Sequence, residues 1–436
     1  MWKISNHFSA GGLIGGLLTA GTGSAFLYLE AAGLSNPAAE TLLALIFLLR
    51  LLRGSAGEWF YTGLFLGLFW FGWIGVSFLH YGHPWAVPLV SFAVALIYAA
   101  IFWLMAHTAE RLGKKLSSLF HLRPSLIAAT AKALWLWLWS LIHPFGFDWF
   151  KPELVLVHSY FGVDALTFGW VLAGVLFLYI AFYEERGGSR PLWLLAGGLL
   201  LIISVDTRKA RILSSDPNGE ILLETVHMPV EQKWRPENRE RQIREVLGRI
   251  DRAVARGKRA VILPESVLPL FLNRSPKLLE ALRDRSWHID IVLGALYLTP
   301  DRQNRNSAYL FHEGNYTVAD KVVLVPFGEA NPLPDWAGRW LNKIFFDGAP
   351  DYTPASKATE FHFAGKSFRA AVCYEGTSER LYRDRPRRIV MLSNNGWFYP
   401  SIEPVLQRLL LEFYHRKYGT EIWHAVNMGE SYIVTE

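Results

Sequence analysis

The chain has 436 residues, with 44 Lys and Arg, 38 Asp and Glu and one cysteine. Residues 1–205 hold 11 of the basic and 9 of the acidic side chains, and also 12 of the 18 tryptophans. A single cysteine excludes an intramolecular disulfide, and a net charge of +6 made of interspersed signs gives little support for nucleic acid binding. The pattern predicts a polytopic α-helical membrane domain over 1–205 and a water-soluble domain over 206–436.

Seven apolar segments of the first half predict seven membrane helices. A helix needs about 17–25 mostly apolar residues to cross a bilayer, so the second and seventh segments are short. The predicted spans are 8–29, 37–52, 59–80, 85–107, 124–143, 164–183 and 190–205. Lys and Arg, such as Arg53 and Lys114, lie in every second loop between these spans. Every second loop is on the same side of the membrane, and the positive charge marks that side as cytoplasmic. Seven spans then place residues 206–436 outside, in the periplasm of a bacterium with two membranes. The spacing of His80 and His83 is too short to predict a metal pair.

The second half alternates between helical and strand patterns. Residues 236–256 have apolar side chains at helical spacing, and Gly257 ends that pattern. Strands are predicted over 259–263, 289–298, 307–311, 368–374 and 388–393. "HEGN" (312–315) predicts a hairpin turn that returns the chain through "YTVADK". Such alternation within about 230 residues predicts one α/β domain.

Three predicted strands end at reactive groups: Glu265, Lys321 and Cys373. A cysteine nucleophile needs a proton acceptor, and the oxyanion that it creates needs a fixed donor or positive charge. A carboxylate and an ammonium group can fill these two roles without histidine. The alternative is that the cysteine is a small buried apolar residue and the two charged groups are solvated.

Four segments carry a resemblance to a known family: "VILPESVLP", "DKVVLVPFGEANPLP", "VCYEG" and "LSNNGWF". They resemble the signature segments of the nitrilase (carbon–nitrogen hydrolase) superfamily, and in combination those of its membrane branch, the apolipoprotein N-acyltransferases. "HPFGFDWF" (143–150) is similar to a loop of that family. The resemblance implies a membrane domain followed by an αββα sandwich outside the bilayer.

The resemblance also implies roles for individual residues. It makes Glu265 the general base, Lys321 the group that stabilises the tetrahedral intermediate and Cys373 the nucleophile. The supporting residues that it implies are Glu329, Tyr374, Glu375 and Trp234.

"SNNGWF" (393–398) has two interpretations. Asn394 or Asn395 shapes the site while Trp397 and Phe398 contact lipid, or the segment is a polar turn that ends a strand.

The implied reaction moves an acyl chain from a phospholipid through a cysteine thioester to the amine of a diacylglyceryl-Cys apolipoprotein, without metal or organic cofactor. Two departures leave alternatives open. Tyr414, His415, Arg416 and Lys417 replace an Arg-Ala-x-Glu element next to the expected active-site wall, before a strand "VNMGESYIV". The chain also stops at Glu436, where the family normally continues to a final span. The alternatives are a truncated chain, a conjugal-transfer TraB-type paralogue with another amine acceptor or amidase activity, and a non-catalytic membrane scaffold.

Overall fold

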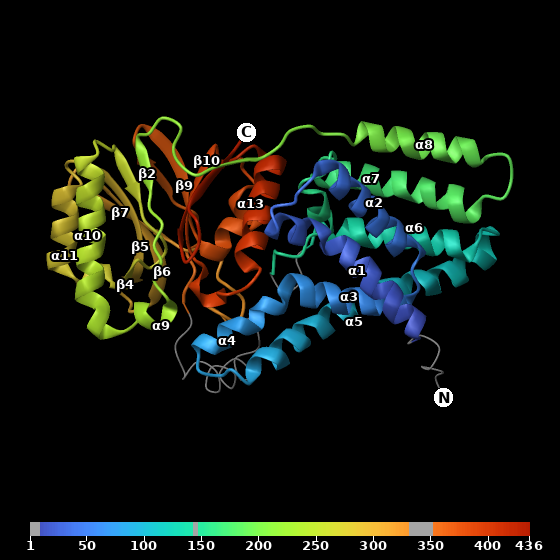
Figure 1. Cartoon of the computed structure of the whole chain (residues 1–436), viewed down its shortest axis with the longest axis horizontal. Helices are drawn as coiled ribbons and strands as arrows, with labels where there is room; N and C mark the ends of the chain where they lie inside the picture. The colour runs from blue at the N-terminus through green and yellow to red at the C-terminus, as the bar shows by residue number, and fades with distance from the viewer. Residues whose placement is uncertain (1–8, 143–146, 331–351) are drawn as a thin grey trace.

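The computed structural model describes residues 9–142, 147–330 and 352–436, except for the side chain of Phe120. Residues 143–146 of the "HPFGFDWF" loop and 331–334 of the second signature segment therefore lie outside the described part. Figure 1 shows two neighbouring bodies, a helical one and one built on sheets, as predicted. The chain passes from the first to the second after α8.

A helix is present at each of the seven predicted membrane segments. They are α1 (Ala10–Ala31), α2 (Pro37–Arg53), α3 (Ala56–Phe71), α5 (Ala86–Phe120), α6 (Pro124–Trp139), α7 (Ala165–Tyr179) and α8 (Arg190–Ile203). A 3-10 turn, η2 (Gly72–Val76), and α4 (Ser77–His80) continue α3, and a π turn, η5 (Ile180–Glu184), continues α7.

Four of these helical stretches in the described residues are long and apolar enough to cross a membrane: Ala10–Ala31, Ala56–His80, Ala86–Leu119 and Ala165–Glu184. The other three predicted segments are also helical but shorter, so the number of helices that cross the membrane stays a prediction. Helices α2, α6 and α8 have 17, 16 and 14 residues. At 1.5 Å per residue, α8 is about 21 Å long, less than the roughly 30 Å of a hydrocarbon core.

Glycine allows α3 and α5 to pack closely. A Cβ atom on Gly63 would lie 2.5 Å from the carbonyl oxygen of Tyr98, and one on Gly67 would lie 2.7 Å from Cα of Ala95. Both distances are too short for any side chain, so these two positions set the approach of the two backbones. The contact brings α4, at the end of α3, next to the sheet domain (Figure 1).

The second body contains two six-stranded sheets. One has the order β1 (Arg211–Leu213), β12 (Tyr432–Thr435), β11 (Glu421–Asn427), β10 (Arg388–Asn394), β9 (Lys366–Val372), β8 (Glu360–Phe363). The other has the order β2 (Ile221–Leu223), β3 (Ala260–Ile262), β5 (Asp290–Leu298), β6 (Asn304–His312), β7 (Asn315–Asp320), with β4 (Leu268–Phe271) paired to β5.

The two sheets pack face to face and carry helices on their outer faces. Ile262 and Val292 of one sheet share an apolar cluster with Val390 and Ala425 of the other. Helices α10 (Arg239–Ala255) and α11 (Pro276–Arg285) cover one outer face, and α13 (Glu403–Tyr418) covers the other (Figure 1). The predicted αββα sandwich is confirmed.

Two sequence predictions of strands need correction. The strand predicted over 368–374 ends at Val372, and Cys373 begins the 3-10 turn η8 (Cys373–Thr377). "VNMGESYIV" is two strands, because Met428 has a φ of 61° and turns the chain between β11 and β12, which pair antiparallel. Most other predicted elements lie within a few residues of those observed, including the hairpin at "HEGN", where His312 pairs with Asn315.

The two bodies share one apolar core. A single cluster of buried side chains runs from Trp70 of α3 through Phe150 to Tyr374 of η8 and Tyr414 of α13. The sheet domain is thus held against the helices by packing, in addition to the covalent link after α8.

Candidate active site

The three predicted reactive residues follow three strands of the sandwich. Glu265 comes three residues after β3, Lys321 directly after β7, and Cys373 directly after β9. Strands β3 and β7 belong to one sheet and β9 to the other. The charges of Glu265 and Lys321 both act on the Cys373 thiol, and the two charged side chains are only 7% and 1% exposed.

One ion pair and two hydrogen bonds join the charged groups. The Nζ atom of Lys321 lies 2.6 Å from Oε2 of Glu329. The Nδ2 group of Asn306 donates to Oε1 of Glu329 at 3.0 Å and to Oε1 of Glu265 at 2.8 Å. Burial alone would lower the pKa of Lys321, but the carboxylate of Glu329, followed by Cys373 and Glu265, raises it above its ordinary value. Lys321 is therefore a fixed positive charge.

Cys373 has a φ of 53°, in the left-handed region that a non-glycine residue rarely adopts. This turn lifts the thiol out of the strand direction at the start of η8. The side chain keeps part of its surface exposed. Burial, and then the charge of Glu265, raise the pKa of the thiol well above its ordinary value, while Lys321 opposes them. The resting thiol is therefore neutral and needs a nearby proton acceptor to become a nucleophile.

The carboxyl group of Glu265 is suited to receive that proton. Burial raises its pKa, the charge of Lys321 lowers it, and the charge of Glu329 raises it again. A carboxylate with a raised pKa is a stronger base than one in water.

Glu375 ties two parts of the site together through backbone groups. Its carboxylate accepts hydrogen bonds from N–H of Val372 at 2.7 Å, of Val322 at 2.7 Å and of Val323 at 3.3 Å. These amides flank Cys373 and Lys321 in the chain. Burial raises the pKa of Glu375 to about 7, against the charge of Lys321 and the three amide donors.

Tyr374 points to the membrane domain. Its hydroxyl accepts a hydrogen bond from N–H of Asp148 at 2.9 Å, and its ring stacks with Phe147 and Trp149 at centroid distances of 6.2 Å. Trp149 also donates to Oγ1 of Thr377 at 2.5 Å. The described part of the predicted family loop, residues 147–150, thus holds the turn that follows Cys373.

Trp234 lies in the loop after α9 (Val230–Lys233) and is 38% exposed. Its neighbour Lys233 is 2% exposed and donates from Nζ to the carbonyl oxygen of Glu265 at 2.8 Å. Burial lowers the pKa of Lys233 to about 8, although Glu265 and Cys373 oppose the shift. The loop that carries Trp234 is therefore attached to the backbone of Glu265.

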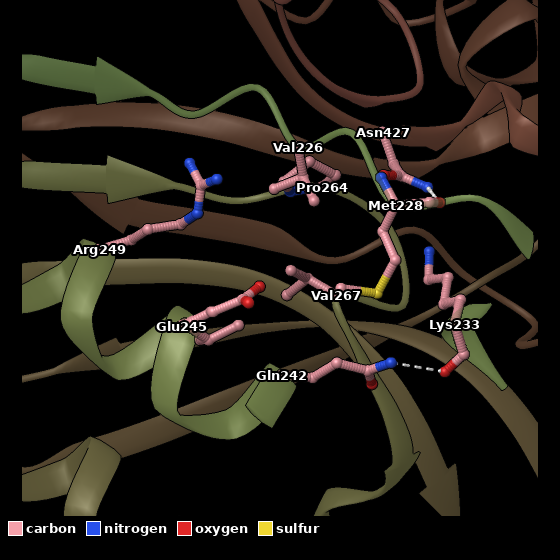
Figure 2. A pocket seen from close by; sticks show the side chains of 10 residues that line it. Val226, Met228, Lys233, Gln242, Glu245, Arg249, Pro264, Val267 and Asn427 are labelled. Carbon is pink, nitrogen blue, oxygen red and sulfur yellow. Dashed lines mark hydrogen bonds between the residues drawn. The ribbon is translucent and has the colours of Figure 1, made fainter. Parts of the chain in front are cut away.

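A small hollow lies beside this loop (Figure 2). The figure shows Gln242 of α10 donating to the carbonyl oxygen of Lys233, at 2.9 Å. The hollow holds about 10 Å³, which is room for about one water molecule.

The segment after β10 contacts both the sheet and the membrane domain. Oδ1 of Asn394 accepts from Nδ2 of Asn427 at 2.7 Å and from N–H of Gly396 at 3.3 Å, as a polar turn would. Asn395 is buried, and its Oδ1 has no hydrogen-bond partner among the described residues.

The two aromatic residues that follow contact the membrane domain. Trp397 stacks on Tyr81 at 5.2 Å, and Phe398 packs edge-on against Trp73 at 4.7 Å. The predicted contact of these rings with lipid stays a prediction.

Sequence reasoning missed three polar residues of the site: Asn306, Lys233 and Glu403. The hairpin register could have identified Asn306, because a turn that pairs His312 with Asn315 places residue 306 opposite 321. Glu403 of α13 is 1% exposed, and its Oε2 has no hydrogen-bond partner among the described residues. Burial, and then the charge of Glu265, raise its pKa to about 8. No sequence signal marks Glu403, because an acidic residue in the first turn of a helix is ordinary.

Residues 414–417, predicted to lie next to the active-site wall, contact both domains. Tyr414 stacks on Tyr382 at 4.4 Å, and Lys417 pairs with Glu379 at 2.7 Å. Arg416 donates to carbonyl groups of the membrane domain, including that of Val157 at 2.6 Å. The segment forms the junction between the two domains.

Comparison with known proteins agrees with this layout. Residues 12–196 match the family model "Apolipoprotein N-acyltransferase integral membrane domain". A relative named apolipoprotein N-acyltransferase from Wolinella succinogenes is 39% identical, over 94% of this chain and 93% of its own. One of the same name from Helicobacter pylori is 32% identical, over 93% and 91%. Among solved structures, an amidase from Nesterenkonia sp. is 15% identical with a TM-score of 0.35, over 49% of this chain and 78% of its own, a likeness too slight to bear on function.

Proposed function

Because the chain belongs to the apolipoprotein N-acyltransferase family, we propose that it moves an acyl chain from a phospholipid to the N-terminal amine of a diacylglyceryl-Cys apolipoprotein. Cys373 carries the chain as a thioester between the two steps. The observation that carries the proposal is the buried chain from Lys321 through Glu329 and Asn306 to Glu265, next to a neutral thiol.

In the first step, the carboxylate of Glu265 takes the proton of the Cys373 thiol, and the sulfur attacks the ester carbonyl carbon of the phospholipid. The ammonium group of Lys321 stabilises the oxyanion of the tetrahedral intermediate. The carbon–oxygen ester bond then breaks, and Glu265 returns the proton to the leaving oxygen of the lysophospholipid. The products are the Cys373 thioester and a lysophospholipid, and Glu265 and Lys321 return to their starting charges.

In the second step, the free amine of the acceptor attacks the thioester carbon. Glu265 takes a proton from the attacking nitrogen, Lys321 again stabilises the oxyanion, and the carbon–sulfur bond breaks. The proton passes to the sulfur, which restores the thiol. An acceptor that arrives as an ammonium ion releases one further proton to solvent, so charge is balanced over the cycle.

Anchoring in the membrane suits this reaction, because both proposed substrates are lipids of the bilayer. We place the sheet domain on the periplasmic side of a bacterial inner membrane. The proposal is supported by the Lys and Arg of the short loops, which mark the opposite face as cytoplasmic. Cysteine labelling of an exposed sheet-domain position in intact cells would test this orientation.

The decisive test is the intact mass of the full chain in detergent after incubation with a phospholipid of known acyl chains. We expect a mass increase of one acyl chain that hydroxylamine removes and that Cys373→Ala lacks. Addition of a diacylglyceryl-Cys peptide should then clear the adduct and acylate the peptide. Absence of any adduct on the folded protein would refute the proposed thioester.

The same experiment separates the alternatives. An amidase would release the adduct to water without an amine, and a scaffold would form none. A TraB-type paralogue with a changed acceptor would form the adduct and reject the lipopeptide. Residues 414–417 motivate the changed-acceptor hypothesis. They contact Val157 and Glu379 at the junction between the two domains.

A further inference from the structure

A second cavity lies where the sheet domain meets the ends of the membrane helices. Its volume is about 210 Å³, and its polar lining residues are Ser35, His158, Ser159, Lys209 and Arg416. Ser35 belongs to the turn between α1 and α2, and Lys209 to the link between α8 and β1. Every charged side chain in this lining is basic.

Arg416 is a buried cation that carbonyl groups hold in place. It is 6% exposed and donates to the carbonyl oxygens of Leu156 at 3.1 Å, Val157 at 2.6 Å and Phe161 at 2.8 Å. Within the described residues it forms no ion pair with a carboxylate, although the charges of Asp206 and Glu412 act on it, and its Nε has no hydrogen-bond partner. A buried cation with no carboxylate in direct contact is costly, so an anion in the cavity would be stabilised there.

The acidic groups nearest to the cavity are paired with other cations. Asp206, whose charge acts most strongly on Arg416, pairs with Arg208 at 2.9 Å. Nε2 of His158 lies 2.7 Å from Glu412, and its Nδ1 lies 3.6 Å from Glu40 and 3.7 Å from Glu30. Arg408 also pairs with Glu30. Lys209 is exposed, and it has no ion pair in the parts of the chain that the structure covers. Lys209 and Arg416 therefore remain available to an anion.

The cavity lies at one end of the helical domain. It adjoins the end of α1, the start of α2 and the link that follows α8, so we expect it to face the lipid headgroups at the end of α1. Apolar side chains with no protein cover lie beside these ends, with Leu34 66%, Ile202 68% and Ile203 67% exposed. A lipid here could place its acyl chains against these apolar side chains and its phosphate group next to Lys209 and Arg416.

We propose that this cavity binds the phosphate group of an anionic membrane phospholipid, at a site separate from Cys373. A volume of about 210 Å³ is about twenty times that of the hollow beside the Trp234 loop, which is room for a phosphodiester and part of its headgroup. In Figure 1 the link after α8 runs along the upper edge, whereas α4 and α9, which flank the candidate active site, lie on the lower edge. A lipid in this cavity would join the two domains rather than donate its acyl chain.

Native mass spectrometry of the full chain in detergent tests the site, with phosphatidylglycerol as the probe. Lys209→Glu reverses the charge of an exposed lining residue that is no part of the catalytic machinery. Loss of a charge-assisted hydrogen bond is worth about 1.5–3 kcal/mol, so we expect the affinity for one retained lipid to fall about tenfold or more. Lys277→Glu, an exposed lysine of α11, is the matched control and should retain the lipid.

Two further arms identify the source of the phosphate. Inorganic phosphate at millimolar concentration should not displace the retained lipid, and phosphatidylcholine should be retained less than phosphatidylglycerol. Equal retention of lipid by Lys209→Glu and the parent chain would overturn the proposal. Displacement by inorganic phosphate would overturn the assignment to a lipid. Thioester formation by Lys209→Glu should equal that of the parent chain, so failure here is distinguishable from failure of the proposed acyltransferase.

Discussion

The Asn306 side chain offers the sharpest test of the proposed mechanism. Its Nδ2 group donates to both Glu265 and Glu329, at 2.8 and 3.0 Å, and it is 5% exposed. Asn306→Ala removes both donors and leaves two buried carboxylates with one partner fewer each. Asn306 does not react, so it acts as a positioning residue for the base.

The size of the effect follows from the two hydrogen bonds. A hydrogen bond to a charged group is worth about 1.5–3 kcal/mol, and about 1.4 kcal/mol changes a rate tenfold. If one bond acts on the barrier, thioester formation slows about 10- to 100-fold, and if both act it slows about 10²- to 10⁴-fold. We expect a loss of at least about 10-fold.

The assay is the single-turnover rate of acyl adduct formation on Cys373, followed by intact mass over a range of pH. The hydrogen bond from Asn306 lowers the pKa of Glu265, so its loss should raise that pKa. The acidic limb of the pH–rate profile should therefore move to higher pH, which a merely structural defect would not cause.

Asn315→Ala, at the exposed end of the same hairpin, is the matched control and should leave rate and profile unchanged. A folded Asn306→Ala protein that reacts within about threefold of the parent rate, with an unmoved acidic limb, would refute the reasoning.

Three other substitutions test separate parts of the structure. Glu375→Gln offers one acceptor where three backbone N–H groups now donate, so we expect a loss of about 1–3 kcal/mol, seen as a lower thermal unfolding midpoint in detergent. An unchanged midpoint would contradict the role of these bonds. Burial, and then the charge of Glu265, raise the pKa of Glu403 from 4.5 to about 8. Between these two pH values the folded protein keeps a proton that the unfolded chain releases. The free energy of unfolding should therefore fall as the pH rises from about 4.5 to 8. Glu403→Gln should remove up to about 1.4 kcal/mol per pH unit of this dependence, and identical pH dependences of the unfolding midpoint for the two proteins would argue against it. Trp397→Leu loses a stack on Tyr81 worth about 0.5–1.5 kcal/mol, so the thermal unfolding midpoint in detergent should fall, while Trp287→Leu, 67% exposed, should leave it nearly unchanged.

The sequence predicted the elements that carry the reactive groups. Apolar runs identified β3, β5, β6, β9 and β10. Glu265, Lys321 and Cys373 follow such apolar strands, where charged or reactive side chains are unusual, and this placement marked them as candidates for the site. It was less successful with lengths, since α8 has 14 residues against the 16 predicted and Cys373 lies beyond its strand. Local patterns fix the type of an element better than its ends, because end residues depend on caps and turns such as the φ of 53° at Cys373.

Long-range contacts could not be predicted from local sequence patterns, as residues 147–150 and 416 show. The sequence carries no signal that Trp149 would donate to Thr377, or that Arg416 would bind carbonyl groups of the membrane domain rather than line the active site. Each contact joins segments more than two hundred residues apart in the chain. Such pairs are selected by the packing of the whole molecule.

By itself, then, the sequence determined a helical membrane domain, an α/β domain and the three reactive groups at strand ends, because periodicity and burial are local properties of a chain. Only the tertiary structure decided that Asn306 and Glu329 would link Lys321 to Glu265, and that Tyr374 would be held by the membrane domain. The physical reason is that these groups come from different strands and loops. Their distances are set only when both sheets and the helices pack into one apolar core.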